Sequence, residues 1–112
     1  MQIRKRTIQG MTVLDIEGLI KLGQSAEAFA TTLQKILDEE EGHVLIHLAH
    51  INHIDSTGIG ELVGYLGRFR TQDRKLILVQ PSDRIRRLLD MAQLQTLFPI
   101  YDDLDAALAA EA

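Results

Sequence analysis

Near the start of the chain, apolar and polar residues form two short runs of the kind found in β-strands. These runs, Ile3–Ile8 and Met11–Ile16, are rich in β-formers and are separated by Gln9-Gly10. Two such runs around a two-residue connection that contains glycine are typical of a β-hairpin. The sequence therefore predicts an opening pair of antiparallel strands.

Beyond the hairpin, segments with apolar residues at helical spacing alternate with short continuous apolar runs. Helical spacing extends over Ala26–Leu37, from near Gly58 to Phe69, and over Pro81–Met91. Pro81 suits the first turn of its helix, and Asp102 is placed to cap a final helix. The pattern thus predicts about four helices.

The continuous apolar runs indicate strands that are buried on both faces. They lie at Val44–Leu48 and Leu76–Val79, and Leu97–Tyr101 predicts a short last strand. Strands that alternate with helices form a largely parallel sheet covered by helices. We therefore expect an α/β fold with a mixed sheet of four or five strands.

Composition limits the kinds of protein that the chain can be. Its 112 residues fit a single domain, 1–112, and the net charge of −4 gives no sign of direct nucleic-acid binding. No apolar run approaches the roughly 20 residues that cross a bilayer, and no signal peptide is visible, so we expect no membrane contact. The chain has no cysteine, which excludes disulfides and zinc–thiolate sites and agrees with a cytoplasmic location.

One polar segment, Ile51–Gly60, follows a predicted buried strand and leads into a helix. It contains the run Asp55-Ser56-Thr57-Gly58-Ile59-Gly60. Residue types alone favour a turn with a helix cap, because aspartate, serine and threonine accept hydrogen bonds from the backbone at helix starts. Asp55 can therefore be a cap, or a charge that acts at a binding surface.

In its context this run resembles the signature of anti-sigma factor antagonists, the bacterial STAS domains. Gly18 after the second strand and the segment Pro81–Met91 also match that family, so the resemblance covers almost the whole chain. The resemblance implies that Ser56 is phosphorylated by a partner that is both serine kinase and anti-sigma factor. Binding of the unphosphorylated form frees the sigma factor, and phosphorylation ends the complex. A phosphatase that reverses the modification is also implied.

Several neighbours of Ser56 are candidates for the same site. Thr57 is a second phosphoacceptor candidate, and the partner-binding candidates are Asp55, Thr57, Gly58, Gly60, Gly64 and Lys21. An alternative function is a STAS module of another system, such as a stressosome-type scaffold or a lipid-transport accessory protein, without a serine switch. Either way we expect a binding protein and not an enzyme.

Three glycines, Gly60, Gly64 and Gly67, share one face of the predicted second helix. Each costs roughly 1 kcal/mol relative to alanine within a helix. Two explanations remain open: close packing of the helix on its own sheet, or a smooth face that a partner approaches.

Lys21 is a departure from the family pattern. It stands where the resemblance leads us to expect an aspartate in the loop before the first helix. That loop is expected beside the phosphorylation site, so Lys21 either meets a phosphate or an acidic partner residue, or is a solvated lysine.

The sequence does not contain the residue patterns that metal sites and common catalytic sites require. Four histidines lie close in sequence, but His43 and His47 are expected about 13 Å apart on one strand face, and His50 and His53 in a loop, so we expect no metal site. The phosphate-loop and hydrolase nucleophile patterns are absent, and the lone Asp55 cannot form an aspartic protease pair. We expect no cofactor.

Overall fold

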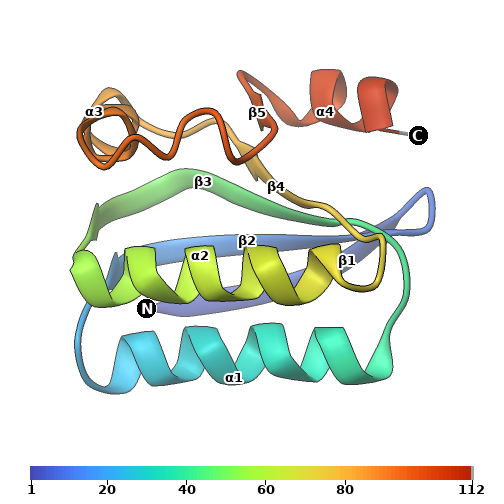
Figure 1. Cartoon of the computed structure of the whole chain (residues 1–112), viewed down its shortest axis with the longest axis horizontal. Coiled ribbons are helices and arrows are strands. Elements are labelled where there is room, and N and C mark those ends of the chain that lie inside the picture. Colours follow the sequence, from blue (N-terminus) through green and yellow to red (C-terminus); the bar gives the residue numbers. More distant parts are fainter. Residues whose placement is uncertain (112) are drawn as a thin grey trace.

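A computed structural model describes residues 1–111, and in it one five-stranded sheet organises the fold (Figure 1). The strands are β1 (Gln2–Ile8), β2 (Met11–Ile20), β3 (Val44–Ile54), β4 (Leu76–Val79) and β5 (Ile100–Tyr101), in that spatial order. β1 pairs with β2 antiparallel, and every later pair is parallel. The expected mixed sheet is confirmed.

The opening hairpin has the tight turn that its sequence predicts. Gln9 and Gly10 both have positive φ, 54° and 77°, as a two-residue hairpin turn of this hand requires. The register then pairs Ile8 with Met11 directly across the turn.

Four helices cover the sheet: α1 (Gln24–Glu39), α2 (Ser56–Arg70), α3 (Asp83–Met91) and α4 (Leu104–Glu111). Each of the first three connects neighbouring parallel strands in the same direction across the sheet, so right-handed crossovers place them on one face. Figure 1 shows α1 and α2 side by side on this side, with α4 across the sheet.

The sheet separates the hydrophobic core into two clusters, one on each face. The larger cluster joins the side chains of α1, α2 and α3 to one sheet face, and includes the fully buried Phe29 and Phe69. The smaller cluster joins Ala107 and Leu108 of α4 to the other face, around Leu45 and Ile77. Because α2 packs on the sheet through one side only, its opposite side is left to solvent.

Several element boundaries differ from the predictions. β3 runs on past Leu48 to Ile54, because β2 also extends, to Ile20, and continues to pair with it across register shifts on both sides of Gly18. His50 and His53 are therefore in a strand and not in a loop, whereas His43 lies outside β3.

The helix starts also need correction. α2 begins at Ser56, two residues before Gly58. Pro81 lies outside α3, which is capped by the hydroxyl of Ser82. In α4 the carboxylate that accepts from the Ala106 N–H belongs to Asp103, so the expectation that Asp102 caps this helix is wrong.

Candidate functional site

The end of β3 and the start of α2 meet at the edge of the sheet, where Ser56 is exposed. Ile54 ends β3 opposite Ile20 of β2, and the Asp55 N–H donates to the Ile20 carbonyl at 3.1 Å. Asp55 is the N-cap of α2 and Ser56 is its first residue. The pairing of β2 with β3 thus positions Ser56, which projects from a helix start that the sheet holds in place.

Both oxygens of the Asp55 carboxylate accept hydrogen bonds from the backbone. Oδ1 accepts from the Gly58 N–H at 3.0 Å, and Oδ2 accepts from the Leu22 N–H at 2.8 Å. These two hydrogen bonds hold the pKa of Asp55 below its ordinary value, and the bond from Gly58 has the larger effect. The structure shows that Asp55 is the cap of α2. The same carboxylate also binds the loop between β2 and α1 through the Leu22 N–H.

Gly58 is buried beneath the start of α2 and does not reach the surface. A Cβ at this position would come within 2.6 Å of Ile54 Cγ1 and 2.8 Å of Ile20 Cγ2. Only glycine lets the first turn of α2 approach the ends of β2 and β3 this closely. The structure therefore places this candidate in the core and not on a partner surface.

The remaining glycines of α2 are open to solvent. A Cβ added at Gly60, Gly64 or Gly67 would meet nothing within 4 Å. The first of the two explanations, close packing of this glycine face on the sheet, is therefore wrong. Residues four apart on a helix share a face, so Ser56, Gly60 and Gly64 form one exposed stripe along α2.

The loop between β2 and α1 lies next to the start of this stripe and carries an exposed apolar residue. Leu22, whose N–H bonds to Asp55, has a side chain that is 77% exposed. Val63, on the exposed side of α2, is 36% exposed. We call Leu22, Ser56, Gly60, Val63 and Gly64 the α2 face. A leucine among the polar and glycine residues of a short loop is a sequence signal for such a surface, and sequence reasoning did not use it.

Lys21 and Thr57 flank the α2 face. Lys21 is exposed, and its loop is held by Ser25, whose Oγ accepts from the Lys21 N–H at 2.9 Å and donates to its carbonyl at 3.0 Å. Thr57, the second residue of α2, is partly buried, whereas Ser56 is exposed. Ser56 is therefore the more accessible of the two hydroxyls.

Two of the histidines, His43 and His47, lie away from this site. His47 is part of a polar chain on the sheet face opposite α2: its Nδ1 is 2.9 Å from Asp15 Oδ1, and its Nε2 is 3.1 Å from Gln80 Oε1. His43 Nδ1 accepts from the Lys75 N–H at 2.9 Å. Within residues 1–111, no three histidine or carboxylate side chains are grouped as metal ligands.

None of the four helices in the described part of the chain is both long and apolar enough to cross a membrane. Together, these features define a small mixed-sheet α/β domain that presents a serine at a helix start. The STAS domain family matches residues 2–107, and this chain belongs to that family.

Its relatives share a regulatory description. The anti-sigma-B factor antagonist of Staphylococcus epidermidis is 30% identical over 88 residues, which are 74% of this chain and 82% of that protein. A Thermotoga maritima structure, provisionally assigned as an anti-sigma factor antagonist, covers 97% of this chain and aligns over 93% of its own, with a TM-score of 0.91 and 19% identity.

A third relative has been solved in two modification states. The anti-sigma factor antagonist SpoIIAA, a Bacillus cell fate determinant, aligns with 97% of this chain in both its unphosphorylated and phosphorylated forms. The alignments cover 94% and 98% of those chains, with TM-scores of 0.73 and 0.77. At 14% identity this likeness shows the shared fold alone.

Proposed function

We propose that this protein is an anti-sigma factor antagonist whose binding to an anti-sigma factor with serine kinase activity is ended by phosphorylation of Ser56. The observation that carries the proposal is the exposure of Ser56 at the first position of α2, beside an open glycine stripe, in a STAS domain. The names of the relatives support the antagonist role.

The position of Ser56 suits a modification that leaves the fold intact. The N–H groups in the first turn of a helix and the helix dipole both favour a negative charge, so a phosphate at Ser56 is tolerated there. The Asp55 carboxylate is already bound to the Gly58 and Leu22 N–H groups. The cap therefore needs no rearrangement when the neighbouring hydroxyl is modified.

The same phosphate acts strongly on a bound partner. It adds about −1.5 to −2 charges at pH 7 to a chain whose net charge is already −4. Within the α2 face, the side chains of Leu22 and Val63 are apolar and two positions are glycine. Burying a phosphate against a partner here incurs a desolvation penalty, because none of the five residues of the α2 face carries a positive charge. A phosphatase acting on Ser56 would restore binding.

The experiment begins by identifying the partner and then measures its affinity. Ser56→Ala protein is used as bait, captured proteins are identified by mass spectrometry, and phosphopeptides of the native chain are mapped over residues 56–57. Titration calorimetry then compares Ser56→Ala and Ser56→Asp against the purified partner. Gln95→Glu, which adds a charge at an exposed position outside the α2 face, is the matched control.

We expect Ser56→Ala and Gln95→Glu to bind as the native chain does, and Ser56→Asp to bind at least tenfold more weakly. Equal affinities for Ser56→Ala and Ser56→Asp would contradict the serine switch. That result would favour the alternative of a STAS module that binds its partner constitutively. Phosphate found on Thr57 and not on Ser56 would move the switch by one residue.

A further inference from the structure

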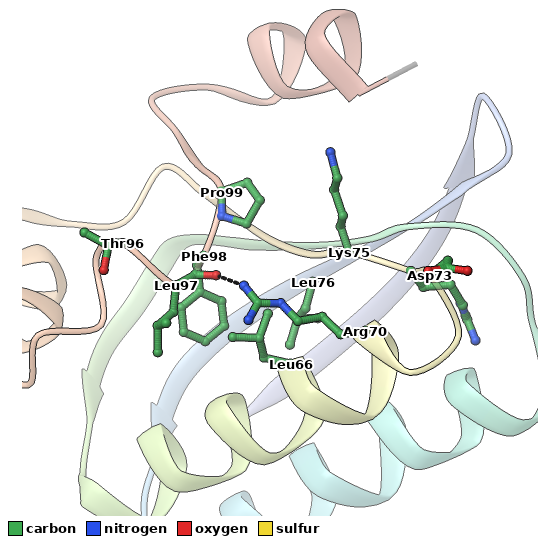
Figure 2. A pocket seen from close by; sticks show the side chains of 10 residues that line it. Leu66, Arg70, Asp73, Lys75, Leu76, Thr96, Leu97, Phe98 and Pro99 are labelled. Atoms are coloured by element: carbon green, nitrogen blue, oxygen red, sulfur yellow. Dashed lines mark hydrogen bonds between the residues drawn. The ribbon is translucent and has the colours of Figure 1, made fainter.

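A groove opens at the far end of α2 from Ser56, about 20 Å along the helix. It has a volume of about 560 Å³ and lies between the end of α2, the start of β4 and the segment before β5 (Figure 2). Cavities that hold small organic ligands have volumes of roughly 300–1,000 Å³. Neither the α2 face nor the proposed switch uses any residue of this groove.

Half of the residues that line the groove are apolar. Leu66, Leu76 and Phe98 are almost completely buried behind it, so the apolar surface that a ligand can reach comes mainly from the partly exposed Leu97 and Pro99. Figure 2 shows the Arg70 guanidinium next to Phe98 and bonded to the Leu97 carbonyl. A ligand that fills the groove therefore needs a substantial hydrocarbon part.

The charges around the groove have the opposite sign to the chain as a whole. Arg70, Arg74 and Lys75 line it against one acid, Asp73, whereas the chain has a net charge of −4. This local excess of positive charge favours an anionic ligand.

Only one of these three cations is free to receive a ligand. Lys75 Nζ donates to Glu111 Oε1 at 2.9 Å, and the buried Arg74 guanidinium donates to carbonyls at the end of α1 and to Gly42. Arg70 makes one hydrogen bond, from Nη2 to the Leu97 carbonyl at 2.6 Å, and no carboxylate of residues 1–111 pairs with it. Four of its five N–H donors remain for a ligand.

We propose that this groove binds an amphiphilic monoanion, an aliphatic carboxylate whose chain lies against Leu97 and Pro99 and whose headgroup pairs with Arg70. A planar carboxylate matches the fork of one guanidinium through two parallel hydrogen bonds. A single free cation suits a single negative charge better than a phosphate dianion. The apolar wall and the lone guanidinium together determine this ligand class.

The probe is sodium decanoate, titrated into the native chain while its amide resonances are followed by NMR. We expect saturable shifts at residues 66, 70, 76 and 96–98, with a dissociation constant on the order of 1 mM or lower. Arg70→Met keeps an apolar side chain of similar length and removes the charge, and we expect it to bind decanoate at least tenfold more weakly. Arg68→Met, which removes the guanidinium over the Tyr65 ring and outside the groove, is the matched control and should bind as the native chain does.

Three further probes decide the ligand class. 1-Decanol has no charged headgroup and tests whether the carboxylate is needed. Decyl phosphate tests whether a dianion is preferred. A peptide that ends in a leucine carboxylate tests whether the carboxylate comes from a protein C-terminus. We expect each to bind more weakly than decanoate. The proposal is overturned if decanoate shifts other residues or none, if Arg70→Met binds it as the native chain does, or if any of these three probes binds at least as tightly.

Discussion

Asp55 and Leu22 are 33 positions apart in the sequence, yet the carboxylate of one accepts the backbone N–H of the other at 2.8 Å. This bond fastens the loop before α1 to the start of α2. The backbone of the exposed Leu22 is thereby held next to the residue that precedes Ser56. One carboxylate thus caps a helix through Gly58 and also positions the loop, two tasks that a hydroxyl cap would not combine in the same way.

The first prediction concerns Asp55 and pH. Its pKa in the folded chain lies below the value of about 3.8 that applies when it is unfolded, so the charged form stabilises the fold above that pH. This contribution is lost as the pH falls through the folded pKa. We expect Asp55→Asn to be less stable than the native chain at pH 5–7, and the difference to shrink below about pH 4.

Urea denaturation at a series of pH values from 6 to 2.5 measures this difference. Asp15, Glu40 and Glu111 also have lowered pKa values, but they titrate in both proteins and cancel in the comparison. A stability difference that stays constant over the whole series would show that the Asp55 charge does not contribute in this way.

The second prediction contrasts two glycines of α2. Gly64→Ala should stabilise the isolated domain by about 1 kcal/mol, because alanine favours the helix and its methyl group meets no neighbour. Gly58→Ala should destabilise it by about 1–3 kcal/mol, because its methyl group would overlap Ile54 and Ile20. Thermal unfolding distinguishes the two variants, because each kcal/mol shifts the melting temperature by about 4 °C.

Partner affinity gives the second half of this test. If the α2 face binds the partner, Gly64→Ala should weaken binding although it stabilises the fold, since one methyl group keeps the partner's backbone away. A stabilised Gly64→Ala protein with unchanged affinity would remove Gly64 from the binding surface. A melting temperature lowered by this substitution would contradict the open position of the glycine itself.

The third prediction concerns Arg74, a residue that is 7% exposed and whose guanidinium binds carbonyls at the end of α1. It donates to the carbonyls of Leu37 at 3.1 Å and Gly42 at 2.8 Å, and it lies over the Phe69 ring, 4.7 Å from its centre. Arg74→Met keeps an apolar side chain against Phe69 but leaves these carbonyls without donors. We expect a loss of roughly 2 kcal/mol in the free energy of unfolding.

Arg84→Met is the control for this measurement, because Arg84 is exposed on α3 and its loss should change stability by no more than about 0.5 kcal/mol. The two variants are compared by urea denaturation at neutral pH. Similar losses for both would show that Arg74 does not stabilise the fold through the end of α1.

Most of the fold could be predicted because its signals are local. The Gln9-Gly10 turn, the apolar runs at Val44–Leu48 and Leu76–Val79 and the helical spacing of Ala26–Leu37 each specify their own element. The second half of β3 could not be found in this way. It is a strand because it pairs with the end of β2, and its polar residues, such as His50, read as a loop when they are considered without that partner.

At the candidate site, too, local features could be predicted and features that depend on packing could not. The run from Asp55 to Gly60 identified the helix start, because capping is a short-range interaction. The sequence did not distinguish the buried Gly58 from the exposed Gly60, since that difference depends on how α2 lies against Ile20 and Ile54. Nor did it indicate the groove beside Arg70, whose walls come from three segments that only the fold brings together.

The last prediction concerns Leu22, the most exposed apolar side chain near Ser56. At 77% exposure it contributes little to the isolated domain, so Leu22→Ala should leave the melting temperature almost unchanged. If the α2 face binds the partner identified with the Ser56→Ala bait, losing this side chain should weaken binding about tenfold, as truncation of a buried interface anchor does. Met91→Ala is the matched control, because Met91 is 82% exposed but lies on α3 and should not affect the affinity. Equal losses for the two variants would indicate non-specific apolar contact, and no loss for Leu22→Ala would place the partner on another surface of the domain.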